Sequence, residues 1–486
     1  MTAPFGMGPG NTVDIGIFDS RGHEFVEAPG FRGWSGTAKR EFFIAPDCAT
    51  PGYIRGPLFP GEWNVMLGVD RIQPAGARDD VTVTLTTEAN ELHHTTEPAT
   101  TLLPARPEAL VGRAEYDSPI PATTPRHGRW LRGDLHCHTV HSDGLNSVED
   151  IVRHAVNLGL DFLAVTDHNT TTHHEELDRL SSFLEGPITL IPGEEVTTYW
   201  GHANTWGLRE WVDFRCGDEE SMRSLQRWVR EKGAMLSINH PKCVGPPWLF
   251  EGWDGFPAME VWQAPWRFYN WESLERWDGL LRQGERVVAV GGSDTHSIPP
   301  APPRHPHGLA EPTTWVFVDG SATPSLPARP EVLVGRAERS TDEGAILDAI
   351  RKGHVFVSDA PNGAHLILTA DEDGDGRFEK MMGDTVEAPE GKPVDFRVQV
   401  RGGMDRRLWL ISDGVPIDII PLSHVDTDYR FSLEPAGRSY LRAELRGYRG
   451  RPERGEVIWA MTNPIWLQAT PRRSAASAPD EARVRL

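Results

Sequence analysis

The sequence contains few cysteines, and they do not form a disulfide framework. Only Cys48, Cys137, Cys216 and Cys243 occur in 486 residues, and no two of them make a C-x-x-C pair. Small secreted domains that depend on disulfides use far more cysteine for their length. Reduced thiols in a cytosolic protein are therefore the simpler interpretation.

Long apolar stretches are also missing. No run approaches the ~18 residues that a helix needs to cross a bilayer. The first eight residues, Met-Thr-Ala-Pro-Phe-Gly-Met-Gly, contain neither the basic segment nor the apolar core of a secretory signal. We therefore expect a cytoplasmic protein that does not associate with membranes.

Positive charge is in deficit. The chain has 49 basic and 70 acidic groups, a net charge of −21, and no long basic run. A protein that binds the nucleic-acid backbone needs a basic surface, so we expect a small-molecule substrate and no nucleic-acid partner. An anionic small molecule stays possible if metal ions dominate the local field. The sequence does not determine the oligomeric state.

Both ends of the chain have the pattern of β domains. Candidate strands at Val13–Phe18, Glu41–Ile44, Trp63–Leu67 and Val81–Leu85 are separated by Gly and Pro, which predicts a β-sandwich or jelly roll over residues 1–125, ending in a proline-rich linker. Short strands return over residues 361–470 and predict a second β-sandwich. Residues 471–486, rich in Arg, Ser, Ala and Pro, are predicted to be disordered.

The central residues, 126–360, alternate between strand and helix patterns. Predicted strands are Leu131–His136, Phe162–Thr166, Ile188–Ile191, Ala234–Ile238, Met259–Trp262, Val287–Val290 and Thr314–Val318, and predicted helices are Ser147–Leu158, His173–Leu184, Glu219–Glu231, 271–283 and 342–352. Mostly apolar strands with helices between them indicate an α/β domain whose sheet is buried on both faces. An open doubly wound sheet and a barrel are both possible. Polar clusters where the strands end favour the barrel.

These polar clusters have the residue types of a metal site. His136, His138 and Asp143 follow the first central strand, Asp167 and His168 the second, and Glu194, Glu195 and His202 the third. His240 follows the fourth strand in Asn-His-Pro, and Asp294 and His296 end the motif Gly-Gly-Ser-Asp-Thr-His. Each cluster alone has an ordinary structural explanation, such as a turn or a cap. Their repetition at one end of successive strands predicts a site for Zn, Mn or Fe with more than one ion.

The ordered set HxH…SDG, TDH, GxE, GH, NHP and SDTH resembles the PHP (polymerase and histidinol phosphatase) superfamily of metal-dependent hydrolases. The phrases Gly133–His138, Pro192–Thr198 and Gly201–Asn204 resemble its CehA/McbA-like branch. The resemblance covers roughly residues 128–360. It implies a distorted (β/α)7 TIM-like barrel, here flanked by the two β-sandwich domains, with two or three divalent ions at the C-terminal ends of its strands.

Carried over to this chain, the resemblance implies a metal ligand set and roles for its members. One ion would take His136, His138 and Asp294, Glu195 would bridge to a second ion held by His202 and His240, and a third would take Asp143, His168 and His296. The family glutamate stands two residues after the glycine, which selects Glu195 over Glu194. The distinction is physical, because a shift of one residue on a strand turns the side chain to the other face. Asp167 would orient a neighbouring imidazole.

The resulting prediction is a phosphoesterase-like hydrolase. Its nucleophile would be a metal-bridging hydroxide held by the ligand set, with Asp294 and His296 in the catalytic machinery. Lys242 and Arg304 are candidate contacts for a substrate anion, although a solvated surface charge is the commoner role for such residues.

Two other functions remain open. The CehA/McbA-like branch implies carbamate or carboxylic-ester hydrolysis. Six tryptophans crowd one segment, namely Trp248, Trp253, Trp262, Trp266, Trp271 and Trp277. We expect most of them in the core, with one or two at the entrance, where they would suit an apolar or aromatic substrate. A binding protein with a vestigial barrel is the other alternative, which the complete ligand set disfavours. A near-duplication of residues 104–115 at 327–338 has no physical explanation from the sequence.

Overall fold

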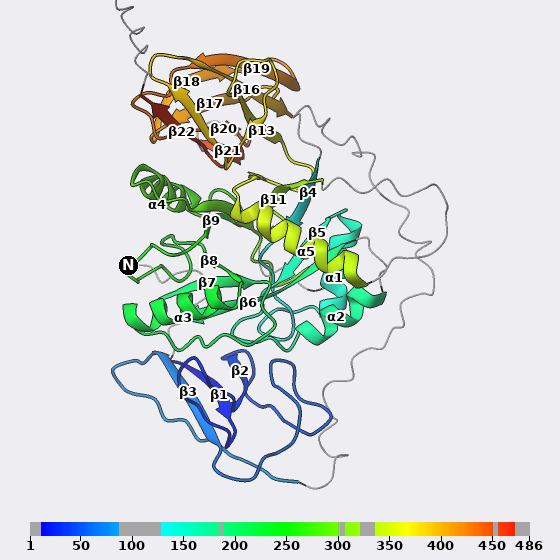
Figure 1. Ribbon diagram of the computed structural model, residues 1–486. Helices are drawn as coiled ribbons and strands as arrows, with labels where there is room; N and C mark the ends of the chain where they lie inside the picture. Colours follow the sequence, from blue (N-terminus) through cyan, green and yellow to red (C-terminus); the bar gives the residue numbers. More distant parts are fainter. Residues whose placement is uncertain are drawn as a thin grey trace, which may run out of the picture.

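The computed structural model describes residues 11–86, 128–183, 188–299, 301, 307–320, 336–450 and 455–471. The predicted linker, the C-terminal tail, Arg304 and most of the two duplicated segments lie outside these ranges. The N-terminal sheet and the C-terminal sheets lie at opposite ends of the molecule, with the central α/β region between them (Figure 1).

The N-terminal region forms one three-stranded antiparallel sheet in the order β2-β1-β3. Its strands are β1 (Thr12–Phe18), β2 (Phe31–Gly36) and β3 (Asn64–Arg71). The predicted strand at Val81–Leu85 is wrong, and at Glu41–Ile44 only Ile44 makes an isolated bridge, to Ala49. β2 was not predicted, because Gly33 interrupts its apolar pattern. Gly33 has φ +142°, and a Cβ there would lie 2.5 Å from the Tyr53 ring, so the close packing requires glycine.

The central region has the predicted alternation of strands and helices. Its strands are β4 (Gly128–Asp134), β5 (Phe162–Val165), β6 (Thr189–Thr198), β7 (Gly201–Trp206), β8 (Met235–Ile238), β9 (Ala258–Gln263), β10 (Val288–Gly292), β11 (Thr313–Asp319) and β12 (Val355–Ser358). Its helices are α1 (Val148–Asn157), α2 (His174–Phe183), α3 (Glu219–Glu231), α4 (Asn270–Arg282) and α5 (Arg336–Arg351). β7 and β12 were not predicted. Helix α1 begins at a capping box between Ser147 and Asp150, and Gly159 follows its end with φ +69°, as the residue types indicate.

Seven central strands lie in the order β10-β9-β8-β7-β6-β5-β4. Neighbouring strands are parallel, except that β7 runs antiparallel to both β6 and β8. A parallel bridge between Cys137 and Thr295 joins the segments that follow β4 and β10, the first and last strands of this order. Buried Asp134 strengthens the junction, because its carboxylate accepts hydrogen bonds from the backbone of Ser293 and Ala310. The strand ends that carry the predicted ligands are thereby brought together.

The central strands are buried on both faces. In β5, Phe162 and Ala164 belong to one hydrophobic cluster, whereas Leu163 and Val165 pack with residues of α1 and α2 in another. This arrangement explains why these strands read as apolar runs and not as alternating patterns. None of the described helices is both long and apolar enough to cross a bilayer.

The C-terminal region is joined directly to the central sheet. β12 pairs with β21 (Glu456–Thr462), and pairing continues through β20 (Tyr440–Tyr448), β17 (Arg407–Ser412) and β18 (Val415–Pro421), with β22 (Ile465–Thr470) and β15 (Thr385–Pro389) alongside. A second sheet contains β14 (Lys380–Met381), β13 (His365–Asp371), β16 (Val394–Arg401) and β19 (Asp426–Leu433). Both sheets contribute to one hydrophobic core, which includes Leu368 and Phe396 from one and Leu410 and Leu445 from the other.

Candidate metal centre

The predicted ligands converge at the ends of the central strands. His136 and His138 follow β4, which ends at Asp134, two residues before the predicted end of the strand at His136. His168 follows β5, and His240 follows β8. The remaining members are Asp143 in the loop after β4, Glu195 in β6, His202 in β7, and Asp294 and His296 after β10. All nine belong to clusters whose potential ligand atoms lie within 4.8 Å of one another.

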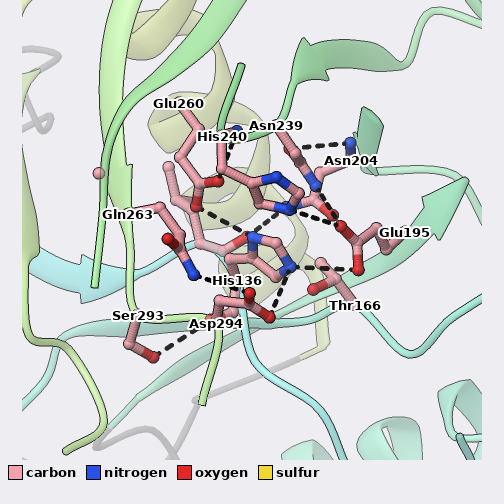
Figure 2. A network of polar contacts seen from close by, with 12 residues as sticks. His136, Thr166, Glu195, Asn204, Asn239, His240, Glu260, Gln263, Ser293 and Asp294 are labelled. Carbon is pink, nitrogen blue, oxygen red and sulfur yellow. Dashed lines mark hydrogen bonds and ion pairs between the residues drawn. The ribbon is translucent and has the colours of Figure 1, made fainter. Parts of the chain in front are cut away.

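The first cluster contains His136, His138, Glu195 and Asp294. Asp294 Oδ1 lies 2.9 Å from His138 Nε2 and 3.3 Å from His136 Nε2. Glu195 Oε2 faces the same two nitrogens at 3.4 and 3.3 Å. Two imidazoles and two carboxylates therefore point at one small volume. Figure 2 shows three of these side chains, His136, Glu195 and Asp294.

The other oxygen of Glu195 faces a second pair of histidines. Oε1 lies 3.1 Å from His202 Nδ1 and 3.3 Å from His240 Nε2. Asn239, from the Asn-His-Pro turn, donates to the same oxygen at 2.9 Å and fixes the carboxylate (Figure 2). The two oxygens of Glu195 thus face different groups of imidazoles.

A third cluster combines His138, Asp143, His168 and His296. Asp143 Oδ1 lies 3.1 Å from His296 Nε2 and 3.6 Å from His168 Nε2. The other nitrogen of His168, Nδ1, lies 2.9 Å from Glu195 Oε2, so this ring connects the third cluster to the first. The structure therefore places the three predicted groups of ligands next to one another.

The chemistry of these donors fits divalent cations. Glu195 Oε2 is buried and has no well-aligned hydrogen-bond donor among the described residues, although imidazole nitrogens of His136, His138 and His168 lie within 3.4 Å of it. Burial lowers the pKa of His136, but the carboxylates of Glu195 and Glu260 outweigh it and raise the pKa well above the usual value. Carboxylates that stabilise the protonated imidazole of His136 in this way would also stabilise a bound cation. Nitrogen and oxygen ligands together suit Zn, Mn or Fe, and the clusters could hold divalent ions.

The histidines of the centre differ in protonation according to their neighbours. Burial and the nearby His296 and His168 lower the pKa of His138 to about 4. Burial also opposes charge on His168, but Glu195 and then Asp143 raise its pKa to about 9. His138 is therefore neutral and ready to bind a cation at pH 7, whereas His168 would release a proton on doing so.

Two of the predicted ligands have a strained backbone conformation. His240 has φ +28° and Asp294 has φ +52°, both in the left-handed region that side chains other than glycine rarely adopt. Such strain persists where the surrounding structure holds a functional geometry.

Glu194 and Glu195 point to opposite sides of β6, as the strand alternation predicts. Glu194 accepts a hydrogen bond from the backbone of Val212 at 2.9 Å and belongs to none of the ligand clusters among the described residues. Burial raises the pKa of Glu194 well above its usual value, so this side chain is a neutral acid in the core. The choice of Glu195 over Glu194 agrees with the geometry.

Sequence reasoning missed Glu260 and Gln263 on β9. Glu260 Oε1 lies 2.9 Å from His136 Nδ1, and its Oε2 accepts from the backbone of His240 at 3.1 Å. Gln263 donates to Asp294 Oδ2 at 2.8 Å (Figure 2). The available signal was a glutamate inside the otherwise apolar strand Met259-Glu-Val-Trp262, since a buried carboxylate needs partners.

Asp167 supports the loop that carries Asp143. Its carboxylate accepts from the backbone and hydroxyl groups of Thr139 and Ser142, and it lies 3.3 Å from His173 Nδ1. Burial opposes the charge, but the imidazoles of His173 and His141 lower the pKa of Asp167 to about 2. Asp167 belongs to no ligand cluster among the described residues, which is consistent with a supporting role.

His141 lies outside the centre. Its Nδ1 is 2.8 Å from Thr172 Oγ1, and its Nε2 is 3.2 Å from Glu176 Oε1. Both ring nitrogens are therefore engaged away from the ligand clusters.

The two predicted anion contacts have different outcomes. Lys242 is 3% exposed, so it is not a solvated surface charge; its ammonium donates to the carbonyl of Gln263 and to Asn270 Oδ1. Burial lowers the pKa of Lys242 to about 7, although the charges of Glu260 and Asp294 act in the opposite direction. Arg304 lies outside the described residues.

The predicted tryptophan cluster is mostly core. Trp248, Trp262, Trp266 and Trp277 are buried in one large hydrophobic cluster, and Trp253 packs against it. Trp271, on the first turn of α4, is the exposed member, and its ring contacts the ring of Tyr269. The cluster therefore gives little support to an aromatic substrate pocket.

Part of this chain is similar to known proteins. Residues 134–217 match the family model of the PHP domain. The 5'-3' exoribonuclease Rnm of Salmonella typhimurium is 44% identical over 71 residues, which are 14% of this chain and 23% of that protein. A 5'-3' exoribonuclease of Haemophilus influenzae is 29% identical over 136 residues, 28% of this chain and 49% of that protein. The chain thus spans about a quarter to a half of the length of these curated relatives.

Two solved structures show a more distant likeness. A two-domain protein from Bacteroides vulgatus, described as containing a predicted PHP-like metal-dependent phosphoesterase, is 18% identical with a TM-score of 0.37, covering 70% of this chain and 96% of that one. An amidohydrolase from Chromobacterium violaceum is 15% identical with a TM-score of 0.27, covering 36% and 91%. Six of the predicted ligands lie in the segment that matches the PHP domain model, residues 134–217: His136, His138, Asp143, His168, Glu195 and His202.

Proposed function

We propose that this protein is a multinuclear metal-dependent phosphoesterase that acts on a small anionic substrate. One observation carries the proposal. The buried carboxylate of Glu195 faces His136, His138 and His168 with one oxygen, and His202 and His240 with the other. A carboxylate placed between two groups of imidazoles suits a bridge between neighbouring cations.

The ligand assignments are part of this proposal. His136, His138 and Asp294 would hold one ion, His202 and His240 a second, and Asp143, His168 and His296 a third, with Glu195 shared between the first two. Divalent ions held there would neutralise charge on the reacting group and activate water near neutral pH. Gln263 orients Asp294, Asn239 orients Glu195, and Glu260 orients His136 through hydrogen bonds.

The finer architecture is proposed on the same basis. The seven strands from β4 to β10, with the bridge between Cys137 and Thr295, support a distorted (β/α)7 barrel as the scaffold. We also propose the sandwich form for the C-terminal domain, since two sheets share its core. Zn, Mn or Fe as the metal and the CehA/McbA-like branch remain proposals from the ligand types and sequence phrases.

The substrate class rests on the metal centre and the names of the relatives. Two of those relatives are called 5'-3' exoribonucleases, so an RNA with a 5'-phosphate belongs among the test substrates. The net charge of −21 disfavours a long nucleic-acid partner and favours a small phosphoester. Carbamate or carboxylic-ester hydrolysis is the competing function, and the mostly buried tryptophans weaken it.

The test uses the full chain reconstituted separately with Zn, Mn and Fe(II). Bound metal is quantified, and turnover is measured on phosphomonoesters, phosphodiesters, a 5'-phosphorylated oligoribonucleotide, carboxylic esters and aryl carbamates. We expect phosphoester turnover that Glu195→Gln abolishes together with bound metal, while the neighbouring Glu194→Gln retains both. Activity confined to carbamates would refute the phosphoesterase proposal. No turnover on any substrate and no retained metal would favour a binding protein.

A further inference from the structure

The predicted metal ligands differ in their exposure to solvent. The Asp143 side chain is 37% exposed, that of His168 is 22% exposed and that of Asp294 is 18% exposed, whereas Glu195 is 1% exposed and His136 is fully buried. The two most exposed of these five side chains lie on the loops after β4 and β5, so a substrate that reaches them would meet these loops.

The N-terminal sheet domain packs on these two loops. The backbone N–H of Gly52 donates to Thr172 Oγ1 at 3.1 Å, and the Gly52 carbonyl accepts from Thr170 Oγ1. A Cβ at Gly52, which has φ +93°, would lie 2.6 Å from the carbonyl oxygen of His141. This close approach fixes the N-terminal domain against the loop that leads to Asp143.

Further contacts fix the domain against the central region. Tyr199, in the turn between β6 and β7, donates to Asp14 Oδ2 on β1 at 2.7 Å. The ring of Phe31 on β2 stacks on Trp211 at 3.8 Å, and Trp211 donates to the carbonyl of Asn169, next to His168. The N-terminal domain is thus held by several hydrogen bonds and aromatic contacts, and it forms part of the surroundings of the centre (Figure 1).

Lys39 brings a positive charge from this domain to the loop that carries Asp143. Its ammonium donates to the carbonyl oxygen of Ser142, the residue before Asp143, at 2.8 Å. Lys39 is half-buried, and burial lowers the pKa of its ammonium, although the charges of Asp167 and Asp143 act to raise it. An ammonium has three donors, and the structure assigns one of them to Ser142.

We propose that Lys39 binds the anionic group of the substrate at the entrance to the metal centre, so that the N-terminal domain contributes directly to substrate recognition. This inference rests on the proposed function in assuming an anionic substrate. Lys242, on the other side of the centre, is less suited to the role, because it is 3% exposed and donates to interior groups. A half-buried ammonium forms stronger charge-assisted hydrogen bonds to phosphate than a fully solvated one.

The experiment measures binding of inorganic phosphate to the metal-loaded full chain by calorimetry, so it does not depend on turnover. Lys39→Met removes the charge and keeps the side-chain length, Lys39→Arg keeps the charge, and Arg40→Met is the matched control at the neighbouring exposed cation. We expect Lys39→Met to weaken phosphate binding about tenfold. Lys39→Arg should retain most of the affinity, and Arg40→Met should leave it unchanged. Bound metal, measured in parallel, should be equal in all four proteins.

Three outcomes would overturn the inference. Lys39→Met could bind phosphate as tightly as the parent, Arg40→Met could weaken binding equally, or Lys39→Met could lose metal in proportion to phosphate, which would make Lys39 a structural support for the Ser142 loop. Failure of this inference can be distinguished from failure of the proposed function. Phosphate binding that depends on Lys39 without phosphoester turnover would uphold this inference alone, whereas turnover insensitive to Lys39→Met would uphold only the phosphoesterase.

Discussion

Replacing Glu260 by glutamine should weaken metal binding without touching a predicted ligand. The Glu260 carboxylate faces His136 Nδ1 at 2.9 Å and accepts from the His240 backbone at 3.1 Å. A carboxylate only accepts, so in the neutral ring Nδ1 carries the hydrogen and Nε2 presents its lone pair to the centre. Glutamine has a single acceptor oxygen and would leave one of these two buried donors without a partner.

The expected loss can be estimated from the two contacts. Hydrogen bonds to a charged group contribute about 1.5–3 kcal/mol. Removing the partner of a ligating histidine typically costs about 10- to 100-fold in metal affinity, which corresponds to about 1.4–2.8 kcal/mol. The two ranges agree, so we expect Glu260→Gln to reduce affinity at the His136 site by about 10- to 100-fold.

The assay is stepwise dialysis of the metal-loaded protein against a chelator series, with bound metal quantified at each step. Glu194→Gln is the matched control, because Glu194 is an equally buried glutamate on a neighbouring part of the sheet and belongs to no ligand cluster. Circular dichroism checks that both variants fold. If Glu260→Gln holds its ions as firmly as the parent protein, the positioning role of Glu260 is refuted.

Three further predictions follow from burial and close packing. The pKa of Glu194 is raised in the folded protein, so its contribution to stability is present below the unfolded value of 4.5 and is lost as pH rises toward the folded value. In urea unfolding, Glu194→Gln should therefore match the parent near pH 4 and be more stable than the parent at pH 7. Equal stability of the two proteins at both pH values would contradict a buried, protonated Glu194. In elemental analysis, His141→Ala should leave the metal content near that of the parent, since both ring nitrogens of His141 contact groups outside the centre. His138→Ala should deplete the metal. Depletion by both variants would make His141 a metal ligand. Gly292→Ala should lower both the melting temperature and metal retention, because a Cβ there would lie 2.4 Å from Glu260 Oε1 and 2.5 Å from His136 Cβ. The control is Gly279→Ala in α4, where a Cβ has room, and it should raise stability by about 0.5–1 kcal/mol. Equal melting temperatures of the two variants would refute the clash.

Local periodicity was enough to find most of the helices and central strands. Helix α3 spans the predicted residues Glu219–Glu231, because its apolar spacing and its N-cap at Asp218 are local properties. β7 was missed although it carries His202, since Gly201-His-Ala-Asn-Thr-Trp206 has neither an apolar run nor a clear alternation. At the N-terminus, Val81–Leu85 has a strand pattern but no pairing, because strand formation needs a partner that the pattern does not specify.

The sequence by itself determined the ligand types of the centre and their order along the chain. His136, His138 and His168 follow strands, whereas Glu195 lies within β6. The family resemblance selected Glu195, and strand alternation explains why its side chain and that of Glu194 face opposite sides.

Only the tertiary structure decided which ligands share a volume and what surrounds them. Glu260, Gln263 and Lys39 are distant in sequence from the residues they support, and their roles arise from contacts across β9 and across the interface with the N-terminal sheet. Sequence spacing fixes which face of a strand a side chain occupies, but the approach of two separate segments depends on the packing of the whole chain.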